Sequence, residues 1–152
     1  MKKILLYSLL MATLFAFSSF TETPAPGGDF VIIVNNQNPI GALTPGEAKL
    51  YFLRKLKNRW PGINKNIRPV TRKTKCGERD AFYGTILKMN DTEVDNYFSE
   101  RQFQNAEKLP EKFGSDAEVI GYVEQEVGAI GFVSAKSLTP ANKSKVKSVL
   151  EF

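Results

Sequence analysis

The sequence predicts an α/β domain, in which a small mixed β-sheet is flanked by about four helices. Three observations carry this prediction. Residues 30–35 form a continuous run of mostly β-branched apolar side chains, which is typical of a buried strand. Two helix-start motifs, at residues 44–47 and 115–118, each precede apolar residues at helical spacing. Residues 145–152 alternate between polar and apolar side chains, as in a strand with one buried face.

The first predicted helix has a well-marked start. Thr44 can cap it, Pro45 suits the first helical position, and Glu47 completes a capping box with Thr44. We expect the helix to run to about Leu56. Its expected inward side chains are Ala48, Tyr51, Phe52 and Leu56.

The middle of the chain predicts a strand followed by two helices. Residues 67–71 form the second strand, and a helix follows from about Gly77 to Lys88. The next helix starts at Asp91 or Thr92. Its expected inward side chains are Val94, Tyr97, Phe98 and Phe103. Residues 104–114 are predicted to be an irregular connection.

The last third of the chain predicts one helix and two strands. The capping box at residues 115–118 opens the fourth helix. Residues 128–133 form a turn entering the third strand, with glycines where another backbone approaches closely. Residues 145–152 form the fourth strand, so that four strands alternate with helices in one domain.

The N-terminus has the features of a signal peptide, at residues 1–18. Lys2 and Lys3 supply its positive charge, and residues 4–17 form its apolar run. Small residues precede a cleavage position after Ser18. The sequence therefore predicts an exported, periplasmic protein.

A flexible spacer is predicted between the signal and the domain. Residues 19–29 contain two prolines and two glycines, and the domain itself spans residues 30–152. An uncleaved N-terminal membrane anchor is the alternative. The apolar run is short for this role, because a bilayer crossing needs about 20 residues.

Several kinds of catalytic and metal site are excluded by composition. The chain has no histidine, and its one cysteine is Cys76. A Ser-His-Asp site, a Cys-His site and a usual zinc site therefore cannot be built, and no disulfide can form within the chain. We expect a protein that is not an enzyme and has no cofactor.

Charge is distributed unevenly along the chain. The net charge is +5 and falls to +3 when Lys2 and Lys3 leave with the signal. Residues 48–75 carry ten basic side chains and no acidic one, whereas residues 76–126 carry twelve acids and five bases. One end of the domain is therefore expected to be basic and another acidic. A basic surface suits phosphate, lipid head groups or an acidic partner, and nucleic acid is not expected for an exported protein. A merely solvated face of lysines is the alternative.

The candidate site lies between the second strand and the second helix, at residues 69–82. The strand ends in Arg72, a basic loop follows, and Cys76 and Gly77 open the helix. The first amides of a helix lack intrahelical partners and attract anions, and an arginine adds a two-pronged charged contact. This arrangement predicts an oxyanion site. The alternative is a solvated basic loop between two core elements.

Several short pieces of the sequence together resemble one lobe of the phosphate ABC-transporter substrate-binding proteins. They occur in order along nearly the whole mature chain. The pieces are residues 31–34 with 38–40, residues 44–47, Arg59 with Trp60, residues 67–70 with Arg72, Gly77 with Arg79 and Phe82, Phe103 with residues 109–110, and residues 119–123 leading to 128–133.

The resemblance implies export, a single periplasmic-binding-protein-like lobe and oxyanion binding, with a membrane transporter complex as a possible partner. In the family, an arginine followed by a Ser-Gly-Thr helix start holds phosphate. The ligand-binding residues implied here are Arg72, Cys76, Gly77, Glu78 and Arg79.

Three positions depart from the family pattern. Cys76 stands where the family has serine, Glu78 where it has threonine, and Thr74 where an aspartate accepts a hydrogen bond from protonated phosphate. Two hydroxyl donors and one acceptor are therefore changed. Glu78 also competes with a bound anion for the helix dipole.

Three functions follow as hypotheses. The first is an exported protein that binds phosphate or a related oxyanion. The second is an interaction module on the same lobe fold that has lost high-affinity anion binding and meets an acidic partner or a membrane surface. The third is an enzyme with Cys76 as nucleophile, whose thiol pKa would be lowered by the helix start and by Lys75 and Arg79.

Overall fold

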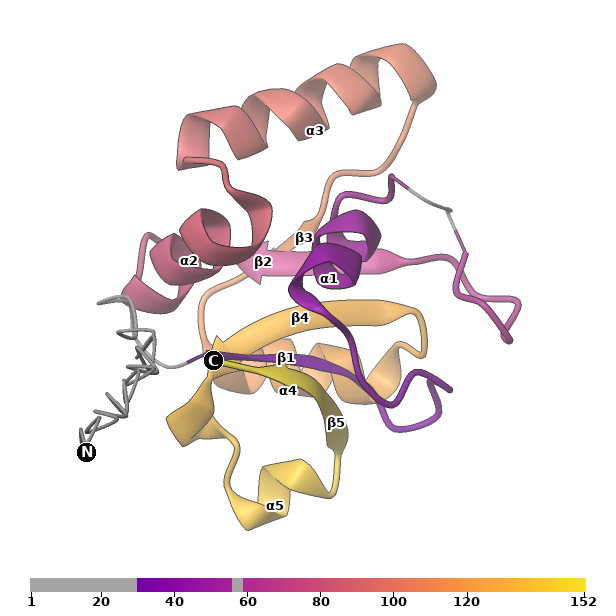
Figure 1. The fold of residues 1–152 in the computed structure, drawn as a ribbon, viewed down its shortest axis with the longest axis vertical. Helices are drawn as coiled ribbons and strands as arrows, with labels where there is room; N and C mark the ends of the chain where they lie inside the picture. Colours follow the sequence, from indigo (N-terminus) through magenta and orange to yellow (C-terminus); the bar gives the residue numbers. More distant parts are fainter. Residues whose placement is uncertain (1–29, 56–58) are drawn as a thin grey trace, which may run out of the picture.

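A computed structural model describes residues 30–55 and 59–152 of the chain (Figure 1). The predicted signal peptide and spacer, residues 1–29, lie outside the described part, as do residues 56–58. Within the described ranges, no helix is both long enough and apolar enough to cross a membrane.

A five-stranded sheet forms the centre of the molecule (Figure 1). Its strands, in spatial order, are β3 (Glu111–Phe113), β2 (Arg68–Arg72), β4 (Ala129–Ser134), β1 (Phe30–Asn35) and β5 (Val146–Glu151). β2 runs parallel to β3 and β4, whereas β1 runs antiparallel to β4 and β5. The sheet is therefore mixed, as predicted, and the carboxyl ends of β2, β3 and β4 lie at the same end of it.

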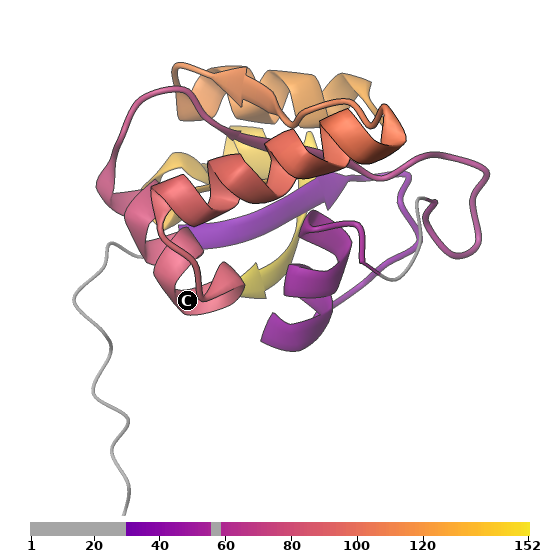
Figure 2. The same ribbon diagram turned by 90° about the horizontal axis from the view of Figure 1, so that it is seen from above.

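Helices cover both faces of the sheet. They are α1 (Pro45–Phe52), α2 (Gly77–Phe82) with its π-helical continuation (Tyr83–Leu87), α3 (Asp91–Asn105), α4 (Asp116–Gln125) and the short α5 (Pro140–Lys143). A 3₁₀ turn, Ala135–Ser137, follows β4. Seen from above, α4 lies on one face of the sheet, while α1, α2 and α3 lie on the other (Figure 2). The predicted α/β class is confirmed.

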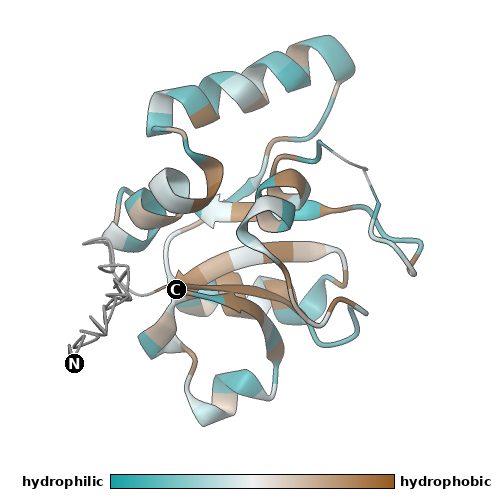
Figure 3. Ribbon diagram, in the orientation of Figure 1, coloured by the Kyte–Doolittle hydropathy of each residue, from teal (hydrophilic) through white to brown (hydrophobic). Residues whose placement is uncertain are grey.

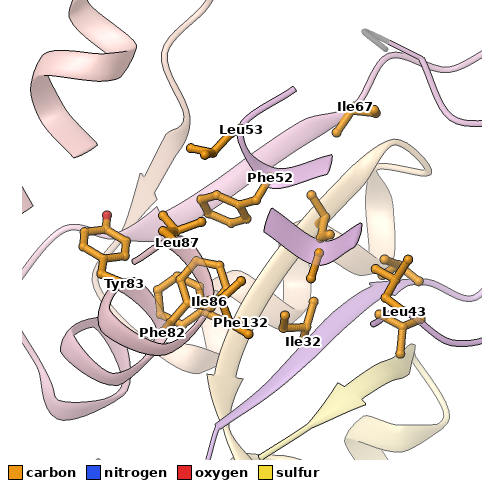
Figure 4. Close-up of a cluster of buried hydrophobic side chains, with 14 of the residues drawn as sticks. Ile32, Leu43, Phe52, Leu53, Ile67, Phe82, Tyr83, Ile86, Leu87 and Phe132 are labelled. Atoms are coloured by element: carbon orange, nitrogen blue, oxygen red, sulfur yellow. The ribbon is translucent and has the colours of Figure 1, made fainter. Parts of the chain in front are cut away.

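The central strand β1 contributes to two cores. Ile32 and Val34 belong to the larger core, in which the rings of Phe82 and Phe132 stack with centroids 4.3 Å apart (Figure 4). The alternate residues of β1 pack under α4 in the second core. Because both faces of the strand are covered, its run of apolar residues is continuous rather than alternating. β1 is accordingly brown along most of its length in the ribbon coloured by hydropathy, whereas β3 is largely hydrophilic (Figure 3).

The first helix starts as predicted and ends earlier. The Thr44 side chain accepts a hydrogen bond from the Glu47 amide, and the Glu47 carboxylate accepts one from the Thr44 amide at 2.8 Å. The expected end near Leu56 is wrong, because α1 stops at Phe52. Arg54 then adopts a left-handed conformation, with φ of 53°, which an α-helix cannot continue through.

Two expectations for the second half are also wrong. The connection predicted over residues 104–114 contains β3, whose three residues pair in parallel with β2. Phe103 does not face inward, since it is 92% exposed, and the buried residues of α3 are Val94 and Phe98. Phe103 follows Phe98 by five positions, which places it about 140° around the helix from the buried side.

Candidate functional site

The candidate site lies at the carboxyl end of the parallel strands. β2 ends at Arg72 and β4 ends at Ser134, and α4 starts beside them at Asp116. In open α/β sheets this end, where strands give way to helix starts, is where ligands bind. Arg72 and the start of α2, which the sequence predicts as parts of the site, lie at this end of the sheet.

Arg72 is paired inside the protein rather than exposed. Its guanidinium forms an ion pair with the carboxylate of Asp116 and donates a hydrogen bond to the Gly114 carbonyl at 3.0 Å. Its side chain is only 12% exposed, and its Nε atom is buried without a hydrogen-bond partner in the described chain. Arg72 is therefore not an exposed residue of the loop that follows β2.

Asp116 gathers donors around one carboxylate. Besides the Arg72 guanidinium, its Oδ2 atom accepts hydrogen bonds from the Ser134 amide at 3.0 Å and from the Ser137 hydroxyl at 2.6 Å. An arginine, a backbone amide and a hydroxyl are the donors that typically bind an oxyanion. The carboxylate of Asp116 thus occupies an anion-binding position formed by the chain itself.

The helix start at Cys76 carries no side-chain cap. Cys76 is the N-cap residue of α2, but its thiol makes no capping hydrogen bond, whereas Thr44, Asn90 and Ser115 all cap their helices. Gly77 is exposed and Glu78 half-buried in the first turn. The leading amides of α2 therefore lack the side-chain acceptor that the other helix starts have.

The surroundings of Cys76 disfavour the thiolate form of its side chain. Burial raises the pKa of Cys76 above the usual value for a cysteine. The third hypothesis needs a lowered pKa at this residue, so the direction of the shift opposes it. In the described chain, moreover, no group of three His, Cys, Asp or Glu side chains is placed to hold a metal ion.

Arg79 joins the strand end to the next helix. Its guanidinium pairs with the Asp91 carboxylate at 2.5 Å and donates to the Arg72 carbonyl at 3.4 Å. It also lies over the Tyr83 ring, 5.8 Å from the ring centroid. Part of the hydrogen-bonding capacity of the Arg79 guanidinium is therefore used to hold α2, α3 and β2 together.

The basic and acidic stretches of the chain, residues 48–75 and 76–126, are not fully separated in the structure. Arg54, Arg68 and Arg72 pair with Glu107, Glu126 and Asp116, respectively, all from the acidic stretch. The fold thus brings the two stretches together at these points. Exposed basic side chains of the same stretch are Lys55, Arg59, Lys65, Lys73 and Lys75.

Sequence reasoning missed the second half of this site. Asp116 belongs to the helix-start motif at residues 115–118, and a capping role accounts for that motif without any site. Ser134 and Ser137 follow a buried strand, where serines are common. The one local signal was their position after a predicted strand, at the end of the sheet where Arg72 also lies.

Solved structures with the same fold include one phosphate transport receptor and two proteins named as putative or possible phosphate-binding proteins. An ABC-type phosphate transport receptor from Vibrio cholerae superimposes with a TM-score of 0.61 and 22% identity, over 81% of this chain and 46% of that one. A putative phosphate ABC transporter substrate-binding protein with bound phosphate, from Clostridium perfringens, gives 0.58 and 22%, over 81% and 45%. A possible phosphate binding protein from Planctomyces limnophilus gives 0.55 and 17%, over 80% and 41%.

At the level of sequence, no protein-family model and no curated protein matches the chain. The chain spans less than half the length of the solved proteins that it resembles. At these identities the likeness concerns the fold, and these solved proteins are binding components of transporters or proteins named for phosphate binding. The described chain therefore has the fold of a periplasmic-binding-protein lobe, as found in phosphate receptors.

Proposed function

We propose that the chain is an exported binding protein for phosphate or a related oxyanion, with its site at Arg72, Cys76, Gly77, Glu78 and Arg79. One observation carries the proposal. A largely buried arginine ends β2, and a short loop leads from it to a helix start that no side chain caps. A guanidinium and leading helix amides are both donors to oxyanions. Transfer of the anion to a membrane transporter complex belongs to the same proposal, as does a role in binding rather than catalysis.

The shared fold supports the proposal. In an α/β lobe the anion lies where strands end and helices begin, and Arg72 and Gly77 occupy that end of this sheet. Lys73 is exposed beside them and adds positive potential, whereas the exposed Lys75 forms an ion pair with Asp80. We expect binding to be weak, with a dissociation constant above about 10 micromolar, because one lobe supplies only part of a closed shell of donors, each contributing about 1.5–3 kcal/mol.

Asp116 sets the affinity of this site. Its carboxylate neutralises the Arg72 guanidinium, so an incoming oxyanion must share the arginine or displace the carboxylate. Glu78 adds a second negative charge in the first turn of α2. Both acids lower the affinity for a doubly charged ligand more than for a singly charged one. The two acids should therefore lower the affinity for a singly charged oxyanion, including the monoanion of phosphate at low pH, less than the affinity for the phosphate dianion.

A thermal-shift panel tests the proposal. Phosphate and sulfate should raise the melting temperature in a saturable manner, while chloride at matched ionic strength should not. Arg72→Ala should remove the ligand-dependent increment, and Arg72→Lys should restore it incompletely, since an ammonium lacks the planar fork. The increment within each variant is the informative quantity, because loss of the pair with Asp116 also lowers the melting temperature without ligand. An unchanged increment in Arg72→Ala contradicts the proposed site.

A second candidate function has one observation in its favour. Because Asp116 already provides an anion for Arg72, the lobe can be an interaction module without high-affinity anion binding. Its exposed basic side chains at Lys55, Arg59 and Lys65 would then contact an acidic partner or a membrane surface. Salt-sensitive sedimentation with anionic lipid vesicles, together with no response to phosphate, would support this function over the first.

A further inference from the structure

A cavity of about 290 Å³ lies between α3 and the sheet. Its apolar lining comes from α1, α3 and the segment that precedes β3: Phe52, Val94, Phe98, Leu109 and Pro110. α3 presents only Val94 and Phe98 as buried residues, and the rest of the helix is largely hydrophilic (Figure 3). The helix therefore covers this part of the sheet without filling the space beneath it.

Polar contacts hold α3 above the cavity. Tyr97 donates a hydrogen bond from its hydroxyl to the Leu53 carbonyl at 2.7 Å, and Arg79 pairs with Asp91 at the start of the helix. These contacts tie the start and the middle of the helix to neighbouring elements, beside the two buried apolar side chains Val94 and Phe98.

A hydroxyl pair in the lining has a proton to spare. Thr71 and Tyr83 are both buried, and their oxygens lie 2.7 Å apart, so that one hydroxyl donates to the other. Two hydroxyls carry two protons, and their mutual hydrogen bond uses only one. The Tyr83 hydroxyl points away from the Phe82–Phe132 stack (Figure 4). No hydrogen bond among the described residues uses the remaining proton, and both side chains line the cavity.

The charges at the cavity cancel. Asp95 and Lys112 both line it, and their charged groups lie 3.3 Å apart as an ion pair. A charged ligand would therefore find no free opposite charge in the cavity. Burying an unpaired charge in a partly apolar space costs free energy. Ser99 is the remaining polar residue of the lining and is exposed to solvent. The buried lining thus favours a neutral molecule with apolar bulk and one acceptor for the spare proton.

We propose that this cavity binds a small neutral aromatic molecule carrying one hydrogen-bond acceptor, such as a carbonyl, with the acceptor on the Thr71–Tyr83 hydroxyl pair. The aromatic side chains Phe52 and Phe98 offer ring contacts to the ligand. The cavity is distinct from the oxyanion site. Thr71 and Arg72 are consecutive in β2, so their side chains point to opposite faces of the sheet, and Arg72 pairs with α4 on the other face. The proposal therefore does not depend on phosphate binding.

Acetophenone and ethylbenzene are a suitable pair of probes, since they share a ring and differ in the carbonyl acceptor. The protein obtained by expressing the full chain is titrated with each. The double variant Thr71→Val/Tyr83→Phe removes both hydroxyls and nearly preserves the volume. It should weaken acetophenone binding about two- to tenfold, the scale of one neutral hydrogen bond, and leave ethylbenzene unchanged or tighter.

A matched control is Tyr122→Phe. It removes a tyrosine hydroxyl from α4, which packs on the other face of the sheet and does not line the cavity, so it should leave the affinity for acetophenone unchanged. A second measurement needs no variant: at saturation, acetophenone should give intermolecular nuclear Overhauser effects to the methyl groups of Val94 and Leu109. Effects to other methyl groups only, no saturable binding, or equal losses of both probes in the double variant would overturn the proposal.

Discussion

The guanidinium of Arg72 is paired with the carboxylate of Asp116, which lies 44 positions further along the chain. The pair connects the end of β2 to the first turn of α4, and both side chains are largely buried, at 12% and 16% exposed. The same carboxylate accepts from the Ser134 amide and the Ser137 hydroxyl. The arginine of the proposed anion site is thus already paired with an anionic side chain of the protein itself.

Asp116→Asn should increase phosphate affinity and lower stability. The amide keeps the shape of the carboxylate and removes its charge, so the Arg72 guanidinium becomes available to an anion. Breaking a largely buried pair on one side should cost about 3 kcal/mol in the free energy of unfolding. Calorimetry with phosphate and urea denaturation measure the two effects. Glu118→Gln is the control, because it alters an exposed acid in the same helical turn that does not contact Arg72. Equal phosphate affinities in all three proteins would contradict this account.

Cys76→Ser and Glu78→Thr should each strengthen phosphate binding. A serine hydroxyl is a stronger donor than a thiol, and a neutral hydrogen bond contributes about 0.5–1.5 kcal/mol, or two- to tenfold in affinity. Serine also suits the N-cap position, which Cys76 leaves without a side-chain hydrogen bond, and should stabilise the helix start by about 1 kcal/mol. Glu78→Thr removes a negative charge beside the proposed anion. The larger effect should come from Glu78→Thr, as calorimetry with each variant would show.

The Cys76 thiol should react more slowly in the folded protein than in the unfolded chain. Burial raises its pKa, so the thiolate, which is the reactive form, is less populated in the native state at pH 8. The raised pKa also means that this group's contribution to stability is present below the pKa of an unfolded cysteine and is lost as the pH rises through the folded value. Iodoacetamide labelling followed by mass spectrometry, with and without urea, measures the rates. Faster labelling of Cys76 in the native protein than in urea would contradict this prediction and would support a catalytic role for the thiol.

Gly128→Ala should destabilise the fold. A Cβ atom at Gly128 would lie 2.1 Å from the Asn66 carbonyl oxygen, and the Gly128 carbonyl accepts from the Arg68 amide and from the indole of Trp60. The backbone must shift at this point, at a cost of a few kcal/mol, about the scale of overpacking in a core. Gly121→Ala is the matched control. It lies inside α4 with nothing within 4 Å of the new Cβ atom, and should stabilise by about 0.5–1 kcal/mol. Equal urea midpoints would contradict the close approach.

The sequence predicted those helices and strands whose signals come from residues close together in the chain. The apolar run of β1, the capping box at Thr44, the helix from Gly77 and the strand β5 all depend on neighbours within a few residues. The alternation predicted for β5 is wrong, because its buried residues Val146 and Val149 belong to different cores and its register with β1 shifts along the strand. β3 was missed because its three residues are mostly exposed and form a strand only by pairing with β2. Phe103 was misplaced because an aromatic residue was assumed to be buried without regard to its angle around α3.

The candidate site was predictable only where it is contiguous. Arg72, Cys76 and Gly77 lie within six positions, and a strand end followed by a helix start is visible in sequence. Asp116 and Ser137 reach the same place through the packing of α4 and the turn after β4. No local pattern encodes that convergence, so the pairing of Arg72, and with it the burial of its side chain, could not be predicted.

A phosphate titration followed by ¹⁵N nuclear magnetic resonance tests the central claim most directly, because it reports which donors meet the anion. The account predicts saturable shifts that are largest at the Gly77 and Glu78 amides and at the Arg72 side chain, and that chloride at matched ionic strength does not reproduce them. Shifts concentrated on residues 49–55 and 59–65, or no saturable shifts at all, would contradict an oxyanion site at the end of β2.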